Sequence, residues 1–178
     1  MSNVTLPLSL SLLILLAACG QPESKTVPTT SNATNALLLD LDPGEATTVI
    51  QAKSNGPSQD IVVEGRIFDI TKGFALMRMM DLSLDYCGEI NKESKCPTPW
   101  DFCCDNPDDV KASSVLVKAV DPSGETIEAD SLANLRLLDK IKVKGELIKD
   151  EHGNLVLIAT GWYRTARPDL PDYIEWPE

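Results

Sequence analysis

The stretch Ile61-Val62-Val63-Glu64-Gly65-Arg66-Ile67 alternates between two faces, and Ile141-Lys142-Val143-Lys144-Gly145-Glu146-Leu147 repeats the pattern later in the chain. A period of two predicts a strand with one buried face and one solvated face. Each stretch has a glycine at its fifth position, where a strand can bend and approach its neighbours closely. The two stretches therefore predict the first and fourth strands of a small, tightly coiled barrel.

Three further segments have the composition of strands. They run from Phe74 to Leu84, from Ser114 to Val120 and from Asn154 to Tyr163. Turn-forming residues separate them from their neighbours, at Asp121-Pro122-Ser123-Gly124 and in the hairpin sequence 149–154. Together with the two alternating stretches, these segments predict five strands.

A different period appears between Glu128 and Lys140. Leu132, Leu135 and Leu138 recur there at every third residue, which favours a short helix. The resulting order of three strands, one helix and two strands predicts an all-β, OB-fold-like Greek-key barrel of five strands with one short helix. A sandwich of two sheets is the alternative architecture.

A cysteine-rich loop is expected between the second and third strands. The stretches Phe74-Ala75-Leu76-Met77, Tyr86-Cys87-Gly88 and Cys96-Pro97-Thr98-Pro99-Trp100-Asp101-Phe102-Cys103-Cys104 resemble a family of uncharacterised exported bacterial proteins of OB-like build. The resemblance covers residues 60–163. It implies a fold but no particular activity, because one fold hosts many functions.

The net charge of the chain limits the classes of partner that it can bind. The 178 residues carry a formal net charge of -11 and have a pI near 4.5. Contacts with the phosphate backbone need Lys or Arg, so a general nucleic-acid-binding protein is disfavoured.

The N-terminus has the pattern of an export signal. The apolar run Leu6 to Ala18 has the length of a signal-peptide core and is too short to span a bilayer. It ends in Leu16-Ala17-Ala18-Cys19, which resembles the lipobox of bacterial lipoproteins. The resemblance implies that residues 1–18 are removed and that Cys19 is lipidated. Gly20 stands where the inner-membrane retention signal would have Asp, so an outer-membrane lipoprotein facing the periplasm or exterior is expected.

The remainder of the chain divides by composition. Residues 19–58 are expected to form the lipid anchor and a flexible linker, since 20–35 are rich in Ser, Thr, Pro and Asn. The short apolar pieces within 36–50 are expected at the edge of the domain. The OB-fold-like domain is expected at 59–163, followed by an irregular C-terminal tail at 164–178.

Four cysteines remain for the exported domain, namely Cys87, Cys96, Cys103 and Cys104. An even number in an oxidising compartment predicts two disulfides. Adjacent Cα atoms lie about 3.8 Å apart, which is shorter than the roughly 4.4–6.8 Å of a relaxed disulfide, so Cys103 and Cys104 should not pair with each other. Two pairings stay open, Cys87–Cys103 with Cys96–Cys104, or Cys87–Cys104 with Cys96–Cys103.

A metal-binding or redox protein that uses these four cysteines is the alternative. Zinc and iron–sulfur sites usually contain a C-x2-C pair, and the chain has none among its cysteines. A disulfide between the vicinal Cys103 and Cys104 would be strained. We therefore expect no metal and no other cofactor.

Four residues are candidates for ligand binding. Trp100, within the cysteine-rich loop, could serve as a recognition side chain or a stacking platform. Arg66, Lys142 and Lys144 could form a basic stripe for an anionic oligomer, a nucleic acid or a glycan, but the pattern favours a charged, solvated strand face.

No catalytic constellation accompanies these residues. His152 is the single histidine and falls in a predicted turn, so the pattern indicates no Ser-His-Asp or Cys-His site. The sequence therefore predicts no enzyme. It favours a lipid-anchored binding or assembly module of the cell envelope, attached to the membrane through Cys19, with an envelope protein or a glycan as partner.

Overall fold

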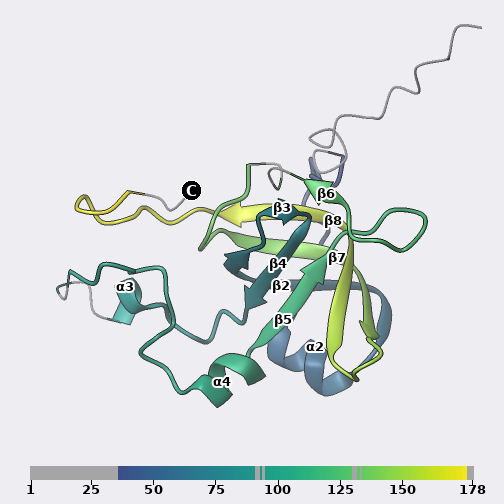
Figure 1. The fold of residues 1–178 in the computed structure, drawn as a ribbon, viewed down its shortest axis with the longest axis horizontal. Coiled ribbons are helices and arrows are strands. Elements are labelled where there is room, and N and C mark those ends of the chain that lie inside the picture. The colour runs from purple at the N-terminus through teal and green to yellow at the C-terminus, as the bar shows by residue number, and fades with distance from the viewer. Residues whose placement is uncertain (1–35, 91–92, 94, 130–131, 133, 176–178) are drawn as a thin grey trace, which may run out of the picture.

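Five strands close into a barrel in the computed structural model, which describes residues 36–90, 93, 95–129, 132 and 134–175. They are β2 (Ser58–Ile70), β4 (Leu76–Met80), β5 (Ser114–Lys118), β7 (Lys140–Lys149) and β8 (Leu155–Ala166). The strands pair in the order β2, β4, β5, β8 and β7, and β7 pairs again with β2 (Figure 1). Only the contact between β5 and β8 is parallel among these pairings. The OB-fold-like all-β class is confirmed, and the closed seam between β2 and β7 excludes the two-sheet alternative.

The two predicted glycines lie where the barrel wall is most crowded. A Cβ atom on Gly65 would lie 2.5 Å from Met79 Cγ and 2.7 Å from the carbonyl oxygen of Met80. One on Gly145 would overlap the carbonyl oxygen of Ile158. Any larger residue would push β4 or β8 away, so both strands can coil this tightly only with glycine.

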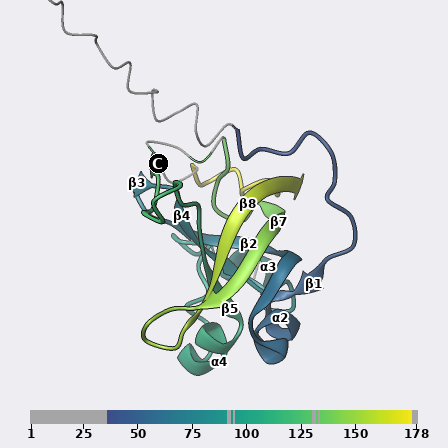
Figure 2. The same ribbon diagram turned by 90° about the vertical axis from the view of Figure 1, so that its right-hand side faces the viewer.

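Helix α2 (Val49–Asn55) closes one end of the barrel. Thr48 caps it, because its side chain accepts from Gln51 N while the Gln51 side chain accepts from Thr48 N. Val49 and Ala52 are buried in the core cluster. Just before the helix, β1 (Thr47–Thr48) pairs in parallel with β2. In Figures 1 and 2, α2 lies beneath the strands, beside α4.

The folded unit therefore begins earlier than residue 59. Leu38 forms a bridge with Trp162 of β8, and Leu39 N donates to the Trp162 carbonyl at 2.8 Å. The predicted boundary between linker and domain falls inside this unit. The predicted signal peptide, Cys19 and the linker up to residue 35 lie outside the described residues.

The helix predicted between Glu128 and Lys140 is wrong. The segment begins with β6 (Glu128–Ala129), which pairs with β3 (Gly73–Phe74), and its later described residues form bends and turns. Asn134 and Leu138 have φ angles of 62° and 65°, which a right-handed helix does not contain. All three leucines are nevertheless buried, because the turns direct them into the barrel.

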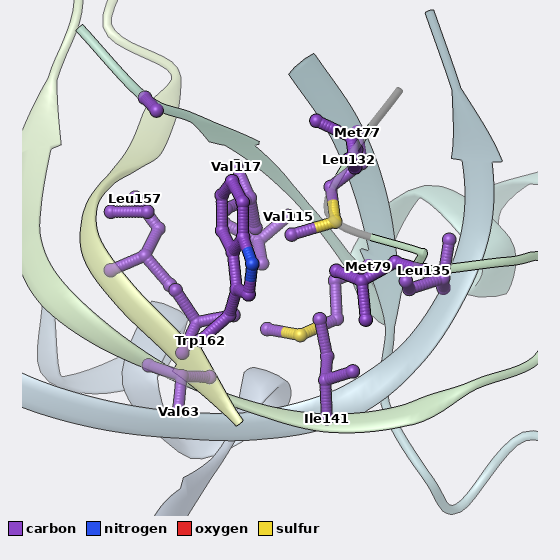
Figure 3. Packing of buried hydrophobic residues seen from close by; sticks show 14 of the residues in the cluster. Val63, Met77, Met79, Val115, Val117, Leu132, Leu135, Ile141, Leu157 and Trp162 are labelled. Atoms are coloured by element: carbon purple, nitrogen blue, oxygen red, sulfur yellow. The ribbon is translucent and has the colours of Figure 1, made fainter. Parts of the chain in front are cut away.

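Side chains from every barrel strand fill the interior. Trp162 is the largest fully buried side chain, and its indole lies among aliphatic residues from neighbouring strands (Figure 3). Met77 and Met79 share one face of β4 and are both buried, where their flexible thioethers fill gaps. Other labelled members of the cluster are Val63, Val115, Val117, Leu132, Leu135, Ile141 and Leu157.

Beyond β8, residues 167–175 form neither helix nor strand.

None of the helices in the described ranges has the length and apolar character needed to cross a membrane.

Candidate functional site

The connection between β4 and β5 contains all four cysteines of the domain. We call residues 81–113 the cysteine segment. It includes the short helices α3 (Cys87–Ile90) and α4 (Pro107–Ala112), and it extends from the side of the barrel in Figure 1. Because β4 and β5 are adjacent and antiparallel, the two ends of the segment meet, and Asp81 N donates to the Ser113 carbonyl at 2.8 Å.

Asp81 fastens the beginning of the cysteine segment to α2. Its buried carboxylate accepts from Ile50 N at 2.9 Å and from both the backbone and the hydroxyl of Ser83, at 3.0 and 2.8 Å. Burial raises the pKa of Asp81, but the hydrogen bonds from Ile50 and Ser83 outweigh it and hold this pKa below its ordinary value. The carboxylate thus satisfies an amide in the first turn of α2.

Arg66 supports the same segment from β2. It is only 2% exposed, and its Nη2 lies 3.0 Å from Glu89 Oε2 of α3. The guanidinium also lies 4.7 Å from the ring centroid of Tyr86, and Nη1 donates to the Leu84 carbonyl. Arg66 therefore holds the segment in place, and the structure does not leave it open to a ligand as the predicted basic stripe requires.

Phe102 provides an apolar contact between the segment and the barrel. Its buried ring meets Phe68 of β2 edge to face, with 5.2 Å between the ring centroids. Trp100 is half-buried and lies two residues away. Trp100 is therefore more accessible than Phe102, as the recognition hypothesis for Trp100 needs.

The sulfur atoms of Cys87, Cys103 and Cys104 lie within 4.8 Å of one another. Two backbone hydrogen bonds bring the halves of the segment together: Cys87 N donates to Asp101 and Gly88 N to Pro99. Cys87 Sγ lies 3.3 Å from Cys103 Sγ and 3.2 Å from Cys104 Sγ. These contacts exceed the roughly 2.05 Å of a disulfide bond, so the four cysteines are free thiols in the structure.

The predicted disulfides therefore stay a prediction, and so does their connectivity. Cys87 is almost equidistant from its two candidate partners, so neither pairing is preferred. Cys96 is half-buried, and its sulfur lies outside the group of three, 3.8 Å from Thr98 Oγ1.

The three clustered thiols differ in acidity. Burial raises the pKa of Cys87, but hydrogen bonds from Cys104 and Cys103 stabilise its thiolate and lower this pKa overall. The same hydrogen bond with Cys87 raises the pKa of Cys103 to about 12, and that of Cys104 rises for the same reason. Cys87 is therefore the thiol that ionises first, with its two neighbours as donors.

Lys142 and Lys144 each have an acidic partner. Lys142 Nζ lies 2.8 Å from Asp42 Oδ1 and also donates to the Gly44 carbonyl at 2.7 Å. The hydrogen bond from Lys142 lowers the pKa of Asp42. Lys144 Nζ lies 3.1 Å from Asp60 Oδ1. The predicted stripe is thus largely neutralised, and sequence alone could not reveal partners so distant along the chain.

Comparisons with known proteins assign neither a family nor a function to this chain. No family model matches the chain, and no curated protein matches it. Among solved structures, it is similar to a putative aspartyl-tRNA synthetase from Leishmania major Friedlin, with 9% identity and a TM-score of 0.40. The match covers 74% of this chain and 23% of that one, so the chain spans less than a quarter of that protein. The OB-fold-like assignment rests on the strand order of the barrel itself.

Proposed function

We propose that this protein is a lipid-anchored binding or assembly module of the bacterial cell envelope, in which the cysteine segment is the recognition surface. The observation that carries the proposal is the contact of Cys87 Sγ with the sulfurs of both Cys103 and Cys104. A disulfide from Cys87 to either partner needs only a short movement of side chains, and it would lock a segment that has little regular structure of its own.

The base of the segment supports the same conclusion. Asp81, Arg66 and Phe102 attach it to α2 and β2 through buried contacts, while Trp100 stays partly accessible. A rigid base with an accessible aromatic residue is a common arrangement for recognition, because ordering costs less on binding. The lipid anchor at Cys19 would hold this surface near the membrane.

The state of the thiols is the first test. We would measure the intact mass of the protein with and without reductant, together with its metal content. Two disulfides predict a gain of about four mass units on reduction and no stoichiometric metal. Four free thiols with bound zinc, copper or iron would contradict the disulfide model.

The recognition role needs a separate test. Trp100→Ala should remove crosslinking of the protein to envelope components while the melting temperature changes little. Tyr173→Ala is the matched control, since Tyr173 is an exposed aromatic residue outside the segment. A large fall in melting temperature with unchanged crosslinking would make Trp100 a packing residue instead.

A soft-metal site is the second candidate function. It is favoured by the three sulfurs within 4.8 Å of one another, since sulfurs around a tetrahedral zinc ion lie roughly 3.8 Å apart. Cys87, Cys103 and Cys104 would supply thiolate ligands. Cadmium added to the reduced protein should then give a thiolate charge-transfer absorbance that Cys87→Ser abolishes. Absence of that absorbance would contradict the metal site, and only the disulfide model would remain.

A further inference from the structure

A groove of about 1040 Å³ lies on the surface beside α2 and α4, apart from the three sulfurs. Its sides come from the C-terminal end of α2, from α4, from β4 and β5, and from the β7–β8 hairpin. Figure 2 shows the hairpin and both helices at this end of the barrel. The groove is large enough for a ligand of several rings or groups, because pockets that bind drug-sized ligands have volumes of roughly 300–1,000 Å³.

The groove is positively charged in a protein that is strongly acidic overall. Lys53, Arg78, Lys111 and Lys149 line it, against Asp150 as the single lining carboxylate. The four cations exceed this acid by three charges, whereas the whole chain carries -11. The carboxylate of Asp150 already accepts hydrogen bonds from the backbone of its own turn, so it is committed to the hairpin.

Lys53 is held at the groove by the protein backbone. Its Nζ donates to the carbonyls of Lys111 and Ser114, both at 2.8 Å. Burial lowers the pKa of Lys53, and the nearby charge of Lys111 lowers it further. The ammonium group of Lys53 is thus fixed within reach of the charge of Lys111, and a bound anion would relieve the repulsion between them.

The lysines of the groove lack acidic partners within the part of the chain that the structure describes. Lys53, Lys111 and Lys149 form no ion pair there, in contrast to Lys142 and Lys144. Arg78 has one distant carboxylate, with its Nη2 3.9 Å from Asp69 Oδ2. The four cations of the groove therefore keep most of their positive charge uncompensated by the described residues, which favours attraction of an external anion.

Apolar side chains form part of the wall, beside polar residues such as Ser54, Ser114 and Asn154. Val110, Leu116, Leu155 and Val156 line the groove, and Leu116 is exposed. Such a wall would contact the carbon skeleton of a ligand, for example a sugar ring.

We propose that the groove binds a ligand with at least two phosphate groups. Lysine ammonium groups bind phosphate as point charges, and each phosphomonoester carries about -1.5 to -2 charges at neutral pH. A single carboxylate would leave most of the excess charge uncompensated. The phosphates can belong to a free phosphate chain or to a phosphorylated saccharide. The inference is independent of the function proposed above, because it involves neither the thiols nor Trp100.

The test is isothermal titration calorimetry of the full chain in non-ionic detergent at low salt, with inorganic tripolyphosphate and with fructose 1,6-bisphosphate. Lys111→Glu and Lys149→Glu should each weaken binding about tenfold, since reversing a charge removes an attraction and adds a repulsion. Lys72→Glu is the matched control, because Lys72 is exposed in the turn before β3, at the other end of the barrel. It should change the affinity less than about twofold.

Either probe can support the proposal. Tighter binding of tripolyphosphate would identify a free phosphate chain, and tighter binding of the bisphosphate would identify a saccharide. Lys149 lies at an exposed strand end, so its variant tests the site even if Lys111→Glu disturbs α4. The proposal is overturned if neither probe binds, or if Lys72→Glu weakens binding as much as the groove variants do.

Discussion

Arg167 and Asp139 form a two-pronged ion pair that joins the residue after β8 to the residue before β7. Arg167 Nε donates to Asp139 Oδ1 and Nη2 to Oδ2, both at 2.7 Å. Asp139 is fully buried at 0% exposure, and its Oδ2 also accepts from Arg136 N at 2.9 Å. The pair therefore fixes the barrel end at which the predicted helix is replaced by turns.

Arg167→Ala should lower the free energy of unfolding by about 3 kcal/mol, because it leaves the Asp139 carboxylate buried without its counter-charge. Urea unfolding followed by circular dichroism would measure the loss. Arg164→Ala is the matched control, since Arg164 is exposed and makes one long hydrogen bond to Asn134. Equal effects of the two variants would show that the ion pair has no special role.

Asp81 should make the free energy of unfolding depend on pH. Its pKa is below the ordinary value in the folded protein, so its contribution is complete above the unfolded pKa of about 3.9 and is lost as pH falls through the lower folded pKa. Asp81→Asn should reduce stability at pH 7 by about 1 kcal/mol and flatten its decline below pH 4.

Urea unfolding at pH 7, 4 and 3 would test this expectation. Asp85→Asn, which alters an exposed acid in the same segment, should leave both stability and its pH dependence close to wild type. An unchanged acid profile in Asp81→Asn would rule out the proposed role of Asp81.

Gly145→Ala should destabilise the barrel by about 3 kcal/mol or more. The added methyl group would overlap the carbonyl oxygen of Ile158, and backbone atoms cannot move aside as a flexible side chain can. Thermal unfolding would show the effect. Glu146→Ala, at an exposed neighbouring position, should change the melting temperature only slightly, and similar shifts for both would argue against the close contact.

Trp162 should tolerate phenylalanine far better than alanine. Its side chain is buried at 1% exposure, and its Nε1 has no hydrogen-bond partner among the described residues. Trp162→Phe removes that unpaired donor along with some apolar contact, so a net loss of about 1 kcal/mol is expected. Trp162→Ala should cost about 3–5 kcal/mol. Denaturant titration would compare them, and equal losses would contradict the expectation.

The barrel was predictable because its signals are local. Alternating residues and a glycine in each of β2 and β7 identify strands that coil tightly, and short turns delimit the others. The error between Glu128 and Lys140 has a physical cause. Leucines at every third residue would form one buried face of a helix. Here the backbone turns at Asn134 and Leu138, which have left-handed φ angles, and buries the same leucines without a helix.

The candidate sites were less predictable because they depend on partners distant in the chain. Asp42, Asp60 and Glu89 decide whether Lys142, Lys144 and Arg66 are available to a ligand. The helix α2 did have a local signal, the capping box of Thr48 and Gln51. The basic groove had none, since it forms only when α2, α4 and the β7–β8 hairpin meet.

The seam between β2 and β7 also has a consequence for the order of folding. It pairs Ile61 with Gly145, so it cannot form until nearly the whole domain is available, and such distant pairing is slow, on the millisecond to second scale. Cys87 is only 16 residues from Cys103 and 17 residues from Cys104. Loops of this size close within about one microsecond. In a newly synthesised chain the sulfurs of Cys87, Cys103 and Cys104 therefore meet many times before the barrel closes. An oxidant that acts at that stage can join these thiols before the barrel has formed.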